Sequence, residues 1–262
     1  MPDLMRPDAK LHYEVSGQGP PLLMLAGMMS DSASWAPLLP LLEKSFTLIR
    51  PDNRTTGRTT PWDAPVSLAI FAEDARAVMQ DAGHAKYHVV GHSLGGLIAL
   101  EMLCQDPQAI ATTTVLATAP MRLRRNIALF ETLITIRQSN APEDTWLRAL
   151  FPWLFSTALY DTPGAIDEAV AASLAYPFAQ SAEAMAHQLS ALGTVNVERL
   201  CGPFNGPVQA LLAQNDQMIP LKDAQAALAG AQVHVIERAG HSIHWDAPHY
   251  VAGKIKAFCT GS

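Results

Sequence analysis

The sequence has few cysteines, few basic residues and no long apolar run, and each shortage excludes a class of protein. The three cysteines are odd in number and lie far apart, so neither a disulfide framework nor a cysteine zinc site is expected. The 18 Lys and Arg are outnumbered by 24 Asp and Glu, which argues against binding to nucleic acid or to an anionic membrane. No apolar stretch has the length that spans a bilayer, and the N-terminal MPDLMRPDAK lacks the apolar core of a signal peptide. We therefore expect a soluble, reduced, cytoplasmic protein, and the sequence leaves its oligomeric state open.

Apolar residues are plentiful, since 49% of the 262 residues are hydrophobic, and this is enough for one large core. Short apolar runs without alternation recur along the chain, as strands that are buried on both faces require. We expect such strands at residues 22–26, 46–49, 87–90, 114–117, 208–212 and 233–236, with an antiparallel edge strand at 10–15. Helical patterns lie at residues 32–42, 67–81, 94–105, 221–229 and 248–258. This alternation predicts an α/β fold with a doubly wound, mostly parallel sheet.

One segment interrupts the alternation of strands and helices. Residues 121–201 carry only helical patterns, broken by prolines and glycines. We expect them to form a helical cap inserted before the last two strands, with residues 1–120 and 202–262 as the α/β core. Open α/β sheets bind ligands at the carboxyl ends of their strands, so a cap over that edge would cover the ligand site.

The most specific motif is the run Gly91-His92-Ser93-Leu94-Gly95, which fits G-x-S-x-G. It stands directly between an expected strand and an expected helix, the setting in which this motif forms a sharp turn that exposes a nucleophilic serine. The N-terminus of the following helix stabilises negative charge near the serine. The motif therefore predicts Ser93 as a nucleophile, and a glycine-rich turn with an incidental serine is the alternative.

A serine hydroxyl is a weak nucleophile that needs a base, and the base needs an orienting carboxylate. Asp216 and His241 each follow the carboxyl end of an expected strand, so they lie at the same edge of the sheet as Ser93. We predict that these three residues form a catalytic triad, with Asp216 as a plain turn residue the alternative. His244 is expected in the last helix, and the His92 side chain is expected to point away from the site.

An oxyanion hole needs two backbone N–H groups that point at the developing charge. The residue after the nucleophile, Leu94, is expected to supply one, and Met28, in the loop after the strand 22–26, is expected to supply the other. The substrate pocket is expected to be apolar. Its expected lining side chains are Met29, Met121, Trp146 and Trp153.

Three arginines stand at the start of the cap, Arg122, Arg124 and Arg125. They could attract a carboxylate on the substrate, and a solvated helix end is the alternative. The pair His241 and His244 has the spacing of two metal ligands, but no third ligand accompanies it. We expect no metal and no organic cofactor.

The chain resembles the α/β-hydrolase fold family over essentially its whole length. The resemblance is carried by the serine motif, the loop at residues 52–59, Asn215-Asp216 and Gly240-His241. It lies in the cap-bearing branch that includes enol-lactone hydrolases, methyl esterases and cofactor-free haloperoxidases. Two positions depart from the family pattern: Thr55 stands where glycine is usual, and Ala26 stands where histidine precedes the glycine of the oxyanion loop.

This resemblance implies a serine hydrolase that acts on a small-molecule carboxylic ester or lactone through an acyl-enzyme, without a cofactor. Haloalkane dehalogenases and epoxide hydrolases resemble the chain but have Asp at the position of Ser93. Carbon–carbon bond hydrolases and perhydrolases use the same triad and stay open as alternatives. So does a non-catalytic ligand receptor built on the same fold.

Overall fold

In the computed structural model, which describes residues 3–122 and 124–261, eight strands form one sheet in the order β1-β2-β4-β3-β5-β6-β7-β8. The strands are β1 (Asp3–Met5), β2 (Lys10–Gly17), β3 (Pro21–Leu25), β4 (Thr47–Pro51), β5 (Tyr87–His92), β6 (Ile110–Leu116), β7 (Val208–Ala213) and β8 (Gln232–Ile236). β2 runs antiparallel to its neighbours β1 and β4, and every other pair is parallel. The predicted α/β fold with a mostly parallel sheet is confirmed.

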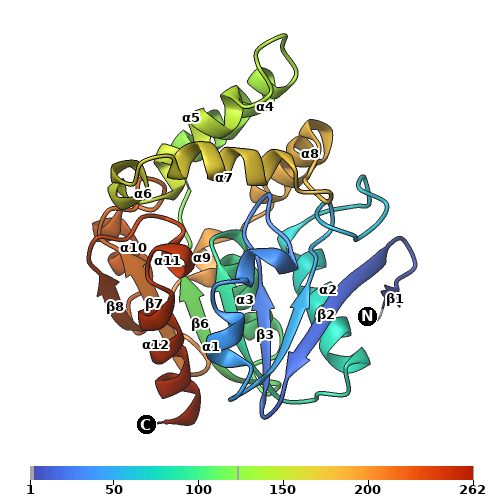
Figure 1. Cartoon of the computed structure of the whole chain (residues 1–262). Coiled ribbons are helices and arrows are strands. Elements are labelled where there is room, and N and C mark those ends of the chain that lie inside the picture. Colours follow the sequence, from blue (N-terminus) through green and yellow to red (C-terminus); the bar gives the residue numbers. More distant parts are fainter. Residues whose placement is uncertain (1–2, 123, 262) are drawn as a thin grey trace.

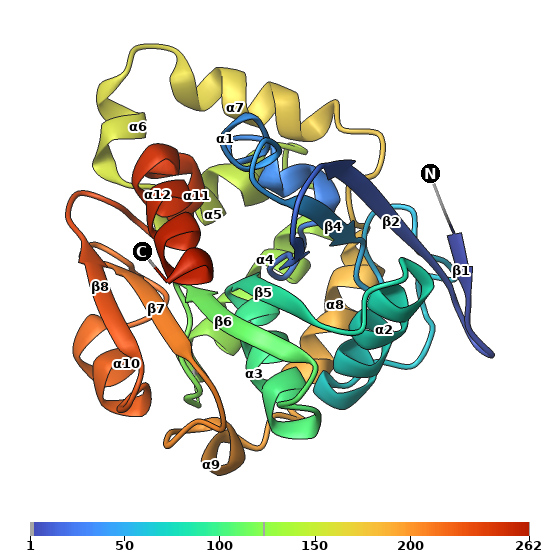
Figure 2. The same cartoon turned by 90° about the horizontal axis from the view of Figure 1, so that it is seen from below.

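Helices cover both faces of the sheet, as Figures 1 and 2 show. One face carries α1 (Leu39–Leu42), α11 (Ile243–Asp246) and α12 (Pro248–Thr260), and the other carries α2 (Leu68–Asp81), α3 (Leu94–Gln105) and α10 (Leu221–Ala227). Successive side chains of a strand point to opposite faces, so each strand supplies both layers. In β3, Leu23 and Leu25 pack in the core on the α2–α3 side, whereas Leu22 and Met24 pack on the α1–α12 side. This is why the central strands are apolar without alternation.

Two local expectations differ from the structure. The strand at residues 10–15 is not the outermost strand, because the short strand β1 pairs with its outer edge. The segment 32–42 is not one helix but a 3₁₀ turn, Ser32–Trp35, followed by α1. Pro37 explains the break, since it has no N–H with which to continue a helix from the preceding turn.

The chain between β6 and β7 forms helices, and its described residues contain no strand. The helices are α4 (Arg124–Arg137), α5 (Thr145–Leu154), α6 (Thr157–Asp161), α7 (Ala165–Leu174), α8 (Ala182–Leu192) and α9 (Val197–Leu200). Figure 1 shows α4 to α8 gathered above the sheet, beyond the carboxyl ends of the central strands, while α9 lies lower, beside α3. Throughout the described residues, no helix is both long and apolar enough to cross a membrane.

Candidate active site

Ser93 is the single residue between strand β5 and helix α3, and its backbone has φ 52° and ψ −118°. A side chain at this positive φ is strained, and such strain is held only by well-fixed surroundings. The flanking glycines allow the turn: a Cβ on Gly91 would lie 2.1 Å from the carbonyl oxygen of Gly95. A Cβ on Gly95 would lie 2.0 Å from the carbonyl oxygen of Leu25. The packing therefore requires glycine at both positions, and the turn presents the serine at the N-terminus of α3.

The three residues of the predicted triad lie together. His241 Nε2 is 2.9 Å from Ser93 Oγ, and His241 Nδ1 is 2.9 Å from Asp216 Oδ2. A carboxylate only accepts hydrogen bonds, so Nδ1–H donates to Asp216, which leaves Nε2 to accept the hydroxyl hydrogen of Ser93. The side chains of His241 and Asp216 are 3% and 2% exposed, so water competes little with these contacts. This arrangement is the one that general-base activation of a serine needs.

Asp216 lies in the loop after β7, and its two oxygens have separate tasks. Its Oδ1 accepts hydrogen bonds from the backbone N–H groups of Met218 at 2.8 Å and Ile219 at 2.9 Å. These bonds hold the carboxylate in one orientation, so Oδ2 stays directed at His241. Asp216 therefore stabilises the turn through Oδ1 and contacts the imidazole through Oδ2 at the same time.

The loop that carries His241 is held by two side chains that the sequence did not indicate. His92 Nε2 donates to the carbonyl oxygen of His241 at 2.9 Å, and Asp246 Oδ2 accepts from the N–H of Gly240 at 2.7 Å. The expectation that His92 points away from the site is therefore wrong, because the end of β5 lies directly under this loop. His244 is not in the last helix but in the short α11, packed against Trp35.

Burial lowers the pKa of His92 to about 3, and it lowers the pKa of His244 as well. Both side chains are nearly inaccessible, and a charged imidazole would lose its hydration without gaining a carboxylate partner. The His92 ring lies 5.0 Å from the ring of His241 and 4.5 Å from that of His244. A positive charge on His92 would therefore also be repelled by a positive charge on His241. His92 therefore stays neutral and keeps its Nε2–H directed at the loop of His241.

This depressed pKa predicts a pH-dependent stability. In the unfolded chain His92 binds a proton below about pH 6.5, whereas in the folded chain it does not, so the free energy of unfolding falls as the pH falls. From pH 7 to pH 5 we expect His92 to remove about 2 kcal/mol. The variant His92→Gln keeps an N–H donor but does not titrate, so it should lose that much less over the same range. Urea unfolding of both proteins at the two pH values measures the difference, and equal losses would contradict it.

The second residue expected to donate to an oxyanion, Met28, lies in the loop after β3. Met28 and Leu94 line the same cavity as Ser93, and within the described residues their N–H groups make no hydrogen bond. The loop passes close to the serine, since a Cβ on Gly27 would lie 3.3 Å from Ser93 Cβ. The next N–H, of Met29, donates to Gln188 Oε1 of helix α8 at 2.9 Å. Two N–H groups without a hydrogen-bond partner among the described residues therefore lie in the cavity beside the nucleophile: that of Leu94 at the start of α3, and that of Met28 in the loop whose Met29 is bonded to α8.

The two departures from the family pattern have local explanations. Ala26 is fully buried, and its carbonyl oxygen accepts a hydrogen bond from Asn53 Nδ2 at 3.1 Å, so this peptide is fixed without a histidine. Thr55 has φ 77°, which explains why glycine is usual there. The amide nitrogen of Gln180 donates to Thr55 Oγ1 at 2.9 Å and to Thr55 O at 3.1 Å. This contact with Gln180, which precedes α8, helps to offset the strain.

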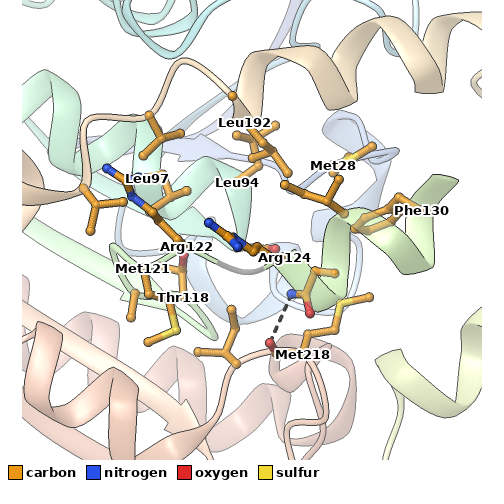
Figure 3. A pocket seen from close by; sticks show the side chains of 18 residues that line it. Met28, Leu94, Leu97, Thr118, Met121, Arg122, Arg124, Phe130, Leu192 and Met218 are labelled. Atoms are coloured by element: carbon orange, nitrogen blue, oxygen red, sulfur yellow. Dashed lines mark hydrogen bonds between the residues drawn. The ribbon is translucent and has the colours of Figure 1, made fainter.

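A cavity of about 320 Å³ opens beside Ser93. Figure 3 shows it, with Met28 and Phe130 on one side of the view and Leu97 and Met121 on the other. Its lining residues are Met28, Ser93, Leu94, Leu97, Thr118, Ala119, Met121, Arg122, Arg124, Asn126, Ile127, Phe130, Leu192, Gly193, Val195, Val197, Met218 and Ile219. The helical segment between β6 and β7 therefore contributes one wall of the cavity, through α4 and the connection from α8 to α9.

Three of the four expected pocket residues are not among those that line this cavity. Met121 lines it, but Met29, Trp146 and Trp153 do not. Trp146 packs under the guanidinium of Arg137, 4.3 Å from the ring centre, and Trp153 lies 5.3 Å from the guanidinium of Arg125. Both tryptophans belong to α5, which packs against α4 and α7. Their side chains therefore contribute to packing within the helical segment.

No group of three His, Cys, Asp or Glu side chains in the part of the chain that the structure describes is placed to hold a metal ion. His244, the second member of the pair considered above, packs its ring against Trp35 and His92.

An α/β sheet with a serine between strand and helix, followed by an acid and a histidine in the loops after the last two strands, defines the α/β-hydrolase class. The sequence profile of the alpha/beta hydrolase family matches residues 22–254, and the chain belongs to this family. It is similar to the carbamate hydrolase RutD of Variovorax paradoxus, with 26% identity over 88% of this chain and 89% of that one. The protein of the same name from Azorhizobium caulinodans is 34% identical over about half of each chain (52% and 51%). The solved enol-lactonase of Burkholderia xenovorans superposes with a TM-score of 0.84 at 18% identity, over 99% of this chain and 100% of that one.

Proposed function

We propose that this hydrolase cleaves carboxylic esters or lactones through a covalent acyl-enzyme on Ser93. The observation that carries the proposal is the pair of 2.9 Å contacts that joins Ser93 Oγ, the imidazole of His241 and Asp216 Oδ2. The cavity beside Ser93, with the N–H groups of Met28 and Leu94 in its lining, supports it.

In the proposed mechanism, Ser93 Oγ attacks the carbonyl carbon while His241 Nε2 takes the hydroxyl proton. The N–H groups of Met28 and Leu94 hold the oxygen that becomes negative, and Asp216 stabilises the imidazolium that forms. The tetrahedral intermediate then expels the alcohol oxygen, which receives the proton from His241. Water, deprotonated by the same imidazole, hydrolyses the acyl-enzyme and restores Ser93. In a lactone the expelled oxygen stays attached to the acyl group.

We further propose that residues 121–201 act as a cap that selects the substrate and excludes water. Its side chains Ile127, Phe130 and Leu192 lie in the cavity wall and are apolar, so they suit an aliphatic or ring-shaped acyl group. The relatives named for carbamate and enol-lactone hydrolysis act on carbonyl groups that pass through the same kind of tetrahedral intermediate. Carbamates and enol-lactones should therefore both be tested as substrates.

The first test measures the hydrolysis of short-chain esters, enol-lactones, carbamates and aryl diketones. The second measures how the acyl group of the best substrate divides between water and methanol. Esters with one acyl group and different alcohols, reacted in a water–methanol mixture, should give one constant ratio of free acid to methyl ester. A common acyl-enzyme requires this constancy, because the alcohol has left before the ratio is decided. A ratio that varies with the leaving alcohol, or hydrolysis of the diketones alone, would overturn the proposal. No turnover of any substrate would favour the ligand receptor.

The cavity wall predicts which cap residue controls acyl-chain preference. Phe130→Ala should enlarge the cavity and shift the preferred ester towards longer or branched acyl groups, by about tenfold in relative kcat/KM. Trp146→Ala and Trp153→Ala are the controls, because these aromatics belong to the same segment but do not line the cavity. The measurement is kcat/KM over a series of acyl lengths, with an activated acetate ester as the reference. A larger shift in the tryptophan variants than in Phe130→Ala would contradict the prediction.

A further inference from the structure

The charged side chains that line the catalytic cavity are all of one sign. Arg122 and Arg124 are among the described residues that line it, and none of these residues is Asp, Glu or Lys. The rest of the lining is mostly apolar, and Figure 3 shows the nitrogens of both guanidinium groups among these side chains. This local positive charge stands in a chain whose net charge is −6. The cavity therefore differs in charge from the protein as a whole.

Internal ion pairing does not account for these two arginines. The guanidinium of Arg124 makes no hydrogen bond or ion pair with another described residue. Arg122 reaches Glu198 at 3.4 Å, in a pair whose side chains are 71% and 76% exposed. A pair so exposed contributes little and is easily exchanged for another anion. Both arginines are thus open to a ligand at the mouth of the cavity.

Arg125, the third arginine at the start of this segment, differs from Arg122 and Arg124 because it has partners within the protein. Arg125 does not line the cavity; its guanidinium donates to the carbonyl oxygen of Gln217 and lies over the ring of Trp153. The neighbouring arginines have no comparable role in holding the cap to the core. A solvated or structural helix end therefore explains Arg125 but leaves the position of Arg122 and Arg124 in the cavity wall unexplained.

We propose that Arg122 and Arg124 form a subsite for a carboxylate of the substrate, distant from the carbonyl that Ser93 attacks. The substrate class is then a half-ester of a dicarboxylic acid, or a lactone that carries a free carboxylate, bound with its reacting end at Ser93 and its carboxylate at the mouth. A guanidinium matches a carboxylate with two parallel N–H···O bonds, which makes it both a charge partner and a geometric one. The aliphatic part between the two ends lies against the apolar lining. This inference rests on the proposed ester or lactone hydrolysis.

The test compares two series of methyl esters: monomethyl esters of straight-chain dicarboxylic acids, and neutral methyl esters of the monocarboxylic acids of equal length. For at least one length, the wild-type enzyme should have the larger kcat/KM for the anionic ester. In Arg122→Met/Arg124→Met this preference, the ratio of kcat/KM for the anionic ester to that for the neutral ester of equal length, should fall by about tenfold or more. Added salt should lower the wild-type preference, because the subsite is open to solvent.

Two matched variants separate a subsite from a general charge effect. Arg148→Met removes one positive charge, where the double variant removes two, from an exposed arginine of α5 that does not line the cavity, and it should leave the preference unchanged. Arg124→Lys keeps the charge but not the forked geometry, so it should retain part of the preference.

An unchanged preference in the double variant, or an equal fall in Arg148→Met, would overturn the subsite. Hydrolysis of neutral esters with no preference for any anionic length would also overturn it, while leaving the proposed function in place. Failure to hydrolyse either series, with no acyl group on Ser93, would remove both.

Discussion

Ser93→Ala is expected to lower kcat/KM for ester hydrolysis by at least about 10³-fold while the protein remains folded. The hydroxyl forms the bond to the acyl group in the proposed mechanism, and no other nucleophile stands 2.9 Å from His241 Nε2 among the described residues. The remaining rate would come only from the oxyanion donors and from substrate binding. Alanine has the same Cβ as serine, so the strain at φ 52° is unchanged and the fold should be preserved.

The measurement is steady-state kinetics of the purified variant, with thermal unfolding and circular dichroism as the controls for folding. Binding of a substrate or product should persist in Ser93→Ala, since the cavity walls are untouched. A folded variant that keeps more than about a thousandth of the wild-type activity would show that Ser93 is not the nucleophile.

The second large effect concerns the proposed base, His241, and the residue that orients it, Asp216. His241→Ala is expected to be as severe as Ser93→Ala, because the proton of the hydroxyl then has no acceptor. Asp216→Asn is expected to lower kcat by about 10³- to 10⁴-fold and to leave somewhat more activity than Ser93→Ala or His241→Ala. The asparagine oxygen can still accept from the N–H groups of Met218 and Ile219, so its NH₂ group would face His241 Nδ1. Two donors cannot share this contact, so Nδ1 would lose its hydrogen, and Nε2 would carry it and no longer accept from Ser93.

Kinetics of the single and double variants test this coupling. Because the three residues act as one unit, Ser93→Ala/His241→Ala should be little worse than either single variant. Multiplicative losses would contradict the coupling, and a nearly active Asp216→Asn would show that the carboxylate does not orient the imidazole.

The fold and the meeting of Ser93, Asp216 and His241 could be predicted because their signals are local in the sequence. Apolar strands without alternation indicate a sheet that is covered on both faces, and Leu22 to Leu25 do pack alternately into two core layers. The glycines around Ser93 indicate the turn, since backbone approaches near 2 Å exclude any side chain there. Asp216 and His241 follow from one rule, that parallel strands end at a common edge.

The supporting contacts could not be predicted, because they join residues that are distant in the chain. The bond from His92 to the carbonyl of His241 spans 149 positions, and that from Met29 to Gln188 spans 159. No spacing rule indicates such pairs. Likewise, composition alone did not decide between core and cavity for Trp146 and Trp153. Their placement depends on which face of α5 packs against the other helices of the segment.

The most direct test of the central claim is covalent labelling by a fluorophosphonate, followed by peptide mass spectrometry. A serine activated by an imidazole attacks phosphorus as it attacks a carbonyl carbon, with loss of fluoride. The account predicts one label per chain, on the peptide that contains Ser93, with none in Ser93→Ala and much slower labelling in His241→Ala. Labelling of another residue, or no labelling of the folded wild-type protein, would contradict it.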